Sequence, residues 1–313
     1  SYQGELVASL YIGGGTPSCL SLEELKSLFL VLANLNLSPT CEITFEANFA
    51  SLSYEKIAFL KEIGVNRISI GLETMHKKYQ NLLGRSLDKN QVEKTISFLK
   101  EKKLTNINLD LMYGFKGETK EELEEDLDFI LALDIPHISL YSLILEDHTI
   151  LKQNKYERLD DDLDQALFSM IEKKLEKNSY IHYEVANYAK ENFFSKHNLT
   201  YWNNDSYYGF GLGASGYLNN IRYTNTRSMT AYLEGKTKNF TEILTKDEIM
   251  DYELILGLRK RKGLNKKHFF RKYGKQLQDV YKYQDLLLRK VLEEDETYLR
   301  VASSYIYVLN EVL

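Results

Sequence analysis

Glycine and carboxylate residues follow short apolar segments in this sequence, and both residue types are suited to binding a charged ligand. The segment "LYIGGGTPS" runs from an apolar stretch into Gly13, Gly14, Gly15 and Thr16. Because glycine loses more conformational freedom on folding than any other residue, three in a row need a reason other than packing. Bare glycine backbone presents unhindered N–H and C=O groups to a ligand. We therefore expect a ligand that contacts the backbone of residues 13–16.

Polar residues also stand at the ends of the next three apolar segments. Glu46 closes "CEITFEA", residues 71–73 follow "VNRISI", and Asp110 lies in "NINLDLMYG". A single polar residue at such a place is usually a turn or a cap. The carboxyl ends of parallel strands, however, meet at one edge of a sheet, where ligand sites of α/β proteins lie. Four polar strand ends at one level therefore favour a shared site.

The elements that would position these residues alternate along the chain. Period-two apolar segments predict strands, and apolar residues at helical spacing predict the helices between them. Ser21 with Glu24, and Thr119 with Glu122, have the spacing of helix capping boxes. The predicted strands are 5–12, 41–47, 65–71, 106–114 and 137–144, and the predicted helices are 21–34, 53–64, 88–103 and 119–133. Such alternation indicates right-handed parallel crossover units, and therefore an α/β barrel or open barrel.

Composition restricts the possible classes of protein. The chain has 313 residues, 43% of them hydrophobic, and a formal net charge of −5, which argues weakly against a nucleic-acid-binding protein. It has neither an apolar run of membrane-spanning length nor the pattern of a signal peptide, so we expect a cytoplasmic protein. Cys19 and Cys41 are too few for a disulfide framework or a four-cysteine metal site.

The C-terminal part has a different composition. The acidic run 160–164 is interpreted as the solvated first turn of a helix, and Thr245 with Glu248 predicts a helix to about residue 261. Two shorter helices and a hairpin or wing in "TYLRVASSYIYVL" complete a winged-helix-like domain. Residues 259–275 hold nine basic residues and no acidic one. They form either a solvated positive face or a docking surface for an acidic partner or a membrane; nucleic acid is disfavoured because aromatics do not interleave with them.

The order of the motifs resembles a known family. "YIGGGTPS", "EITFEAN", "GVNRISIGLE", "LLGR", "INLDLMYGFKGET", "YEVANYA", "SKHNLTYW" and "YYGFGLGA" are similar to radical S-adenosylmethionine proteins related to oxygen-independent coproporphyrinogen III oxidase, and most of all to the HemW type. The resemblance implies an open (β/α)6 barrel in which a [4Fe–4S] cluster binds and cleaves S-adenosylmethionine. It divides the chain into a barrel at 1–150, a connecting region at 151–244 and a C-terminal domain at 245–313.

The resemblance also assigns the cofactor site. The positions expected to contact S-adenosylmethionine are Gly14, Gly15, Thr16, Glu46, Glu73, Arg85 and Asp110. Glycine backbone, carboxylates and an arginine suit a zwitterionic methionine group and a ribose diol. Glu73 departs from the pattern, because relatives usually carry glutamine there, and an ionised carboxylate cannot donate a hydrogen bond. From the residues alone, the alternative for Arg85 is a solvated surface arginine that follows a helix.

The cluster motif of the family is missing. The CxxxCxxC triplet should precede the GGGT loop, whereas Cys19 and Cys41 follow it at the wrong spacing. We expect that the N-terminal strand and cluster loop are absent from this chain; the alternative is a naturally cluster-free relative. In either case this chain alone should not ligate the cluster or cleave the cofactor.

Two functions follow from the resemblance. The HemW type implies a haem chaperone that delivers haem to an acceptor haemoprotein or respiratory-chain component, with possible peripheral membrane association, and the alternative is a coproporphyrinogen III oxidase. In "SKHNLTYW", the residues expected to contact haem are His197, Asn198, Tyr201 and Trp202. The alternative is a hydrogen-bonded loop anchor. Ser215 stands where relatives often carry histidine. The histidines with weaker claims are His137 and His182, which lie in predicted strands, and His76, His148 and His268, which lie in segments expected to be exposed.

Overall fold

The computed structural model describes residues 2–145, 152 and 156–312. The chain divides into two compact units, each described here by itself. The barrel unit comprises residues 4–182 and 186–194, and the second unit comprises residues 1–3, 183–185 and 195–313. His148 lies outside the described residues. Within the described part of the chain, no helix has the length and apolar character needed to cross a bilayer.

The barrel unit is built on a seven-stranded sheet in the order β1-β2-β3-β4-β5-β7-β6. The first five strands are parallel, as the alternation predicts, and β7 is antiparallel to β5. The strands are β1 (Val7–Ile12), β2 (Leu37–Asn48), β3 (Arg67–Glu73), β4 (Ile107–Tyr113), β5 (His137–Ser142), β6 (Ile181–Glu184) and β7 (Asn187–Ala189). Strand β2 begins four residues earlier than predicted, because Leu37 pairs with Val7 of β1.

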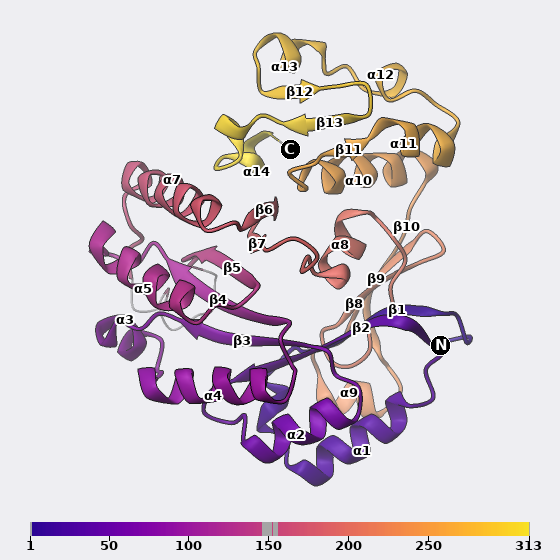
Figure 1. Cartoon of the computed structure of the whole chain (residues 1–313). Coiled ribbons are helices and arrows are strands. Elements are labelled where there is room, and N and C mark those ends of the chain that lie inside the picture. Colours follow the sequence, from indigo (N-terminus) through magenta and orange to yellow (C-terminus); the bar gives the residue numbers. More distant parts are fainter. Residues whose placement is uncertain (1, 146–151, 153–155, 313) are drawn as a thin grey trace. The chain divides into compact units, whose positions relative to one another are not determined.

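Helices that follow the strands cover one face of this sheet (Figure 1). Both predicted capping boxes of the barrel unit are confirmed: Ser21 caps α1 with Glu24, and Thr119 caps α5 with Glu122. Local hydrogen bonds to the first-turn N–H groups thus mark where these helices begin. The helices are α1 (Leu22–Leu32), α2 (Tyr54–Glu62), α3 (Lys77–Leu82), α4 (Lys89–Glu101), α5 (Lys120–Ala132) and α7 (Asp161–Lys177).

The two faces of the sheet differ in chemistry. The face that packs against the helices is apolar and forms the main core with Phe45, Ile68 and Leu109 at its centre. Because successive strand residues point to opposite faces, the residues between these carry the other face. That face is polar and largely buried, and it includes Thr44, Arg67, Ser69, Asn108, His137 and Ser139. A buried polar face is costly unless its groups are hydrogen-bonded, so it is expected to serve a site.

One expectation for the barrel unit is wrong. The acidic run at the start of α7 is not wholly solvated, because Asp164 is buried and accepts hydrogen bonds from the Ser142 hydroxyl at 2.9 Å and from Arg158 at 3.2 Å. Asp160 is the N-cap of α7, as a helix-terminal aspartate would be. The run therefore combines a cap with one structural carboxylate.

The second unit contains two small sheets and short helices. One sheet has the order β10-β9-β8 and the other β11-β13-β12. The predicted capping box of Thr245 with Glu248 is confirmed at α10. The elements are α8 (Lys196–Trp202), β8 (Ser215–Leu218), β9 (Ile221–Asn225), α9 (Met229–Leu233), β10 (Lys238–Ile243), α10 (Lys246–Leu258), β11 (Leu264–Asn265), α11 (Lys266–Tyr273), α12 (Leu277–Val280), α13 (Gln284–Leu288), β12 (Leu292–Glu294), β13 (Tyr298–Val301) and α14 (Leu309–Val312).

The wing lies earlier than predicted. Its hairpin pairs Leu292 with Val301 and Glu294 with Leu299, whereas "SSYIYVL" continues into a 3-10 turn and α14. Of the apolar residues in that stretch, Ile306 and Leu309 are buried. A short apolar run is compatible with either strand or helix, and here packing selected the helix.

Candidate cofactor site and candidate haem helix

Strand register brings the predicted strand ends of the barrel unit into two rows. The first row pairs Glu46 with Ser69, Ser69 with Asn108, and Asn108 with His137. The second row pairs Asn48, Gly71, Asp110 and Ser139 in the same way across β2 to β5. The predicted common level therefore holds for Gly71 and Asp110, whereas Glu46 lies on the same face one row, two residues, earlier.

Glu46 is tied to the glycine loop. Its Oε2 accepts a hydrogen bond from the Gly14 N–H at 3.1 Å, and its Oε1 accepts one from the Tyr11 hydroxyl at 2.5 Å. A Cβ atom at Gly13 would lie 2.7 Å from the Glu46 carboxylate and from the Tyr11 ring. Burial, followed by the charge of Glu46, raises the pKa of Tyr11 far above its usual range, so Tyr11 stays a donor. Only glycine at position 13 lets this carboxylate approach the loop.

Asp110 is held by side chains of neighbouring strands. Its Oδ1 accepts a hydrogen bond from the Asn108 amide at 2.8 Å. Burial raises the pKa of the Asp110 carboxyl, while the hydrogen bonds of Asn108 and Ser139 and the charge of Arg67 oppose that rise. Arg67 is buried on the polar face, and no described group accepts a hydrogen bond from its Nε. Asp110 therefore sits in a polar but poorly hydrated setting.

Glu73 and Arg85 form an ion pair at this edge. Arg85 Nη1 lies 3.0 Å from Glu73 Oε1, with 14% of the Glu73 side chain and 46% of the Arg85 side chain exposed. Burial raises the pKa of Glu73 to about 7, with Arg85 opposing the rise and Asp110 adding to it. In the structure, therefore, Arg85 is partnered by Glu73, whichever of the two sequence-based interpretations holds for its role.

The loop glycines and Thr16 complete the edge. Gly14 has a φ of +107° and Gly15 is exposed, and a Cβ at either position would meet no neighbour within 4 Å. Thr16 caps a short 3-10 helix, with its carbonyl accepting from the Cys19 N–H at 2.8 Å. The edge thus offers exposed backbone, carboxylates and a guanidinium, which is the donor set that a zwitterionic amino acid with a ribose requires.

The described residues offer no cluster site. Cys19 is exposed and Cys41 is buried on β2, and no group of three or more histidine, cysteine, aspartate or glutamate side chains among the described residues could hold a metal ion. The residues present therefore fit an organic zwitterion and do not supply the ligands of an iron–sulfur cluster.

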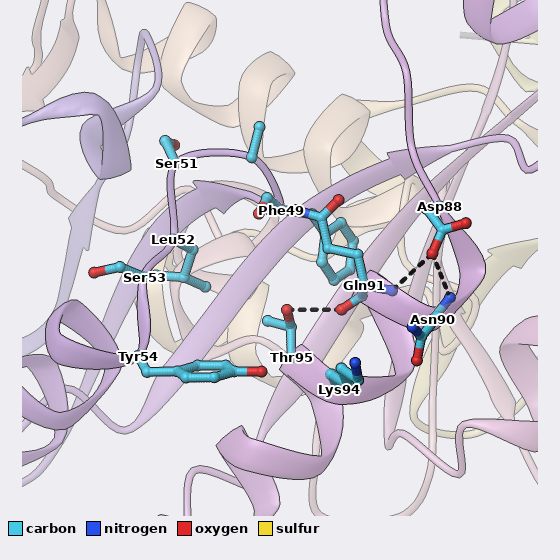
Figure 2. Close-up of a pocket in the computed structure, with 11 residues that line it drawn as sticks. Phe49, Ser51, Leu52, Ser53, Tyr54, Asp88, Asn90, Gln91, Lys94 and Thr95 are labelled. Atoms are coloured by element: carbon cyan, nitrogen blue, oxygen red, sulfur yellow. Dashed lines mark hydrogen bonds between the residues drawn. The ribbon is translucent and has the colours of Figure 1, made fainter.

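A groove lies beside this edge but does not include it. Figure 2 shows it between the beginnings of α2 and α4, and its volume is about 490 Å³. The side chain of Asp88 caps α4 through the N–H groups of Asn90 and Gln91. None of the residues that we predict to contact a cofactor lines this groove. Its helix starts are already capped by side chains, so we assign it no ligand.

The predicted haem residues lie on α8 in the second unit. His197 and Tyr201 are one turn apart, and His197 Nε2 lies 2.8 Å from the Tyr201 hydroxyl. Burial raises the pKa of Tyr201 to about 12, so its hydroxyl keeps its proton. The contact is therefore a hydrogen bond between Nε2 and a neutral hydroxyl, and the tautomer of the ring sets which of the two donates. The nitrogen that most often binds haem iron is already engaged.

Asn198 and Trp202 occupy the adjoining strip of α8. The Asn198 amide lies 3.4 Å from Glu184 Oε1, and its N–H is capped by the Ser195 hydroxyl at 3.2 Å. The Arg259 guanidinium lies 5.7 Å from the centre of the Trp202 ring. Trp202 Nε1 is buried without a hydrogen-bond partner among the described residues. An aromatic ring beside a histidine on one short helix can pack against a flat apolar ligand.

The remaining histidines are placed differently from one another. His137 is fully buried, His182 is buried and stacks on Tyr188 at 4.2 Å, and His268 is exposed, as predicted. His76 is not in an exposed segment, because its side chain is only 19% exposed and its Nε2 lies 2.8 Å from the Glu122 carbonyl. Ser215 lies on β8, where its hydroxyl bonds to that of Thr224 at 3.0 Å.

Comparison with known proteins identifies the family. Residues 3–130 match the model of the radical SAM superfamily, and residues 244–303 match the HemN C-terminal domain. The chain is 39% identical over 305 residues to the heme chaperone HemW of Lactococcus lactis, covering 94% of this chain and 80% of that protein. The chain belongs to the HemW family. A second HemW protein, from Bacillus subtilis, is 36% identical and is covered over 75% of its length.

The HemW family assignment agrees with the fold. Coproporphyrinogen III oxidase HemN of Escherichia coli, a radical SAM enzyme, superimposes with a TM-score of 0.85 at 17% identity, covering 98% of this chain and 77% of that structure. With the family matches, this likeness confirms the predicted open radical SAM barrel followed by a small C-terminal domain. The sequence analysis did not single out Tyr11, Arg67 and Asn108 as site residues. The signal for them was the alternation of residues along each strand, which places all three on the polar face of the sheet.

Proposed function

We propose that this chain acts as a haem chaperone of the HemW type in the cytoplasm, binding haem and passing it to an acceptor haemoprotein. The carrying observation is the extended similarity to HemW relatives together with α8, where His197, Tyr201 and Trp202 lie within seven residues. Histidine is a frequent axial ligand of haem iron, and aromatic rings pack against porphyrin. We also propose that the acceptor is a haemoprotein or a respiratory-chain component, and that the protein associates with the membrane surface when it meets such an acceptor.

The second candidate is oxidation of coproporphyrinogen III. It is favoured by the fold it shares with HemN, but 17% identity supports the fold alone. The relatives of higher identity carry the chaperone name. We therefore place haem binding first.

The proposal includes an S-adenosylmethionine site at the barrel edge. Gly14, Gly15 and Thr16 would meet the amino-acid end of the cofactor, and Glu46, Arg85 and Asp110 would supply acceptors and a donor. The open backbone at Gly14 and Gly15, where a Cβ would meet no neighbour within 4 Å, supports this placement. When bound to a cluster, this cofactor supplies radical chemistry; the residues of this chain bind and orient it.

Haem titration tests the proposal. Haem added to the wild-type chain should give a Soret band that saturates at one equivalent, and His197→Ala should shift the band and weaken binding at least tenfold, about 1.4 kcal/mol. His268→Ala is the matched control, since His268 is an exposed histidine on α11 of the same unit. Unchanged spectra and affinity in His197→Ala would remove α8 from the site.

A parallel incubation separates the two candidate functions. The full-length protein, supplied with its cluster and S-adenosylmethionine, is mixed either with haem or with coproporphyrinogen III under anaerobic reducing conditions. Binding of haem without conversion of the porphyrinogen supports the chaperone function. Conversion to protoporphyrinogen without haem binding would replace it with the oxidase function.

A further inference from the structure

The Glu73–Arg85 ion pair is seated on a backbone arranged for it. Strand β3 has an irregularity between Gly71 and Glu73, where Gly71 pairs with Asp110 and Glu73 pairs with the very next residue, Leu111. Glu73 adopts a φ of +65°, a left-handed conformation that non-glycine residues seldom take. Such a bulge redirects a side chain, and here it turns the Glu73 carboxylate toward Gly71.

Gly71 leaves the space that the pair occupies. A Cβ atom at Gly71 would lie 2.7 Å from Glu73 Oε1 and 3.1 Å from Arg85 Nη1. The carboxylate and the guanidinium thus meet directly above the α-carbon of the residue that pairs with Asp110. The ion pair is therefore part of the same strand-end edge as Asp110, with the carboxylate largely buried and the guanidinium partly exposed.

The charged groups that act on Glu73 come from two other elements. Arg85, in the segment between α3 and α4, attracts the carboxylate, and Asp110, on β4, repels it. Because burial outweighs Arg85, the pKa of Glu73 is about 7, so this carboxyl changes its charge close to neutral pH. Asp110 is in turn influenced by Glu46 of β2 and Arg67 of β3.

We propose that Glu73 is an internal competitor for Arg85, occupying the guanidinium that would otherwise bind the carboxylate of an amino-acid ligand. This inference rests on the proposed S-adenosylmethionine site. Both carboxylates need the same planar donors, and two anions beside each other repel. Ionised Glu73 therefore closes the pair and excludes the ligand carboxylate, whereas protonated Glu73 releases Arg85. Glutamine at this position would have no charge with which to compete.

The sign of the pH effect follows from this competition. Below pH 7, Glu73 carries its proton and the affinity for S-adenosylmethionine is highest. As pH rises through about 7, Glu73 ionises and the affinity falls. Since the pair is partly exposed, we expect a decrease of about fivefold, the factor that corresponds to about 1 kcal/mol.

Equilibrium dialysis of S-adenosylmethionine against the purified chain at pH 5.5 to 8.5 tests the inference. Glu73→Gln should bind about fivefold more tightly than wild type at pH 8.5 and equally at pH 5.5. The ratio of the two affinities cancels the titration of the ligand's own amino group. Glu55→Gln, which changes an exposed glutamate in the first turn of α2, should leave the affinity unchanged. A constant ratio across this pH range would overturn the inference.

A second ligand tests whether the effect of Glu73→Gln depends on the carboxylate of the ligand. 5′-Methylthioadenosine has the nucleoside and the thioether but lacks the amino-acid carboxylate, so its affinity should be the same for wild type and Glu73→Gln at every pH. An equal gain for both ligands would show that Glu73 acts on the site as a whole, and would contradict competition for Arg85.

Arg85→Ala separates this inference from the proposed site. If Arg85→Ala weakens S-adenosylmethionine binding but Glu73→Gln has no pH-dependent effect, the competition is wrong and the site stands. If Arg85→Ala and Asp110→Asn both bind like wild type, the proposed site is wrong and the inference falls with it.

Discussion

Asn108 on β4 and His137 on β5 are register partners, and His137 Nδ1 lies 2.6 Å from Asn108 Oδ1. Burial, followed by the charge of Arg67, lowers the pKa of His137 well below its usual range, so the ring is neutral. With Asn108 Oδ1 also accepting from Ser139, its Nδ2 is directed to Asp110 and Ser69, both at 2.8 Å. A buried histidine thus orients the amide that donates to a candidate cofactor residue.

Replacing this amide should destabilise the barrel unit. Asn108→Ala leaves His137 and Asp110 without a shared partner in a buried setting, which should lower the free energy of unfolding by about 2 kcal/mol. Urea denaturation followed by circular dichroism measures the effect. Asn90→Ala, an exposed asparagine in the first turn of α4, is the control and should change stability by less than about 0.5 kcal/mol. Equal midpoints for both variants would show that the network carries no energy.

Glu118 should make stability depend on pH. Its Oε2 accepts from the N–H groups of Gly114 at 2.6 Å and Phe115 at 3.2 Å, yet burial raises its pKa from 4.5 to about 7. Because the folded pKa lies above the unfolded one, the stabilisation is complete below about pH 4.5 and is lost as pH rises to about 7. The loss should approach about 3 kcal/mol.

Glu118→Gln removes this titration, so the difference in unfolding free energy between variant and wild type should shift by that amount from pH 4.5 to pH 8. The comparison uses the slope of the unfolding free energy against pH, because a packing change caused by the amide alters the absolute stability equally at every pH. Glu121→Gln, at an exposed position in the first turn of α5, the helix that follows Glu118, should follow the wild-type slope. If Glu118→Gln shows the same dependence of stability on pH as the wild type, the titrating group is a residue other than Glu118.

Tyr201 should restrain haem binding if His197 uses Nε2. The Tyr201 hydroxyl lies 2.8 Å from that nitrogen, so iron must displace a hydrogen bond worth about 1 kcal/mol. Tyr201→Phe should therefore raise haem affinity about fivefold while keeping the aromatic ring, as measured by Soret titration. In a His197→Ala background the same change should have no effect. Weaker binding in Tyr201→Phe would mean that the hydroxyl supports the bound haem instead.

The basic segment 259–275 contains two kinds of cation. Lys266 pairs with Glu294 at 3.0 Å and Lys272 with the buried Glu253 at 2.6 Å, whereas Lys267 and Arg271 are exposed one turn apart on α11. Charge steering by exposed cations accelerates association in a salt-dependent way.

The double change Lys267→Gln and Arg271→Gln should slow haem transfer to an acidic acceptor at low salt, leave haem affinity unchanged, and lose its effect near 0.5 M salt as screening shortens to a few ångströms. Stopped-flow transfer rates check this. Lys290→Gln, an exposed lysine outside the segment, is the control. If the double variant and the wild type transfer haem at the same rate at low salt, the basic segment serves only solubility.

Local chemistry is why so much of the fold was predictable. The capping boxes at Ser21, Thr119 and Thr245 join residues three apart, and the apolar periods of strands and helices are properties of short segments. The parallel strand order follows from that alternation, since a strand–helix–strand unit has one favoured hand. Once the order is known, Glu46, Gly71 and Asp110 must share an edge.

Partners distant in the chain were not predictable. Tyr11 and Glu46 are 35 residues apart and Asn108 and His137 are 29 apart, so each pair depends on the register between strands. A shift of one residue would have turned these side chains to the opposite face. The bulge at Glu73 likewise depends on how β3 meets β4, and it alone turns the carboxylate toward Arg85. Residue types and spacing thus determined the sheet, its edge and the candidate ligand groups; strand register and burial determined which of those groups meet and which change charge near neutral pH, because both arise only when distant segments pack together.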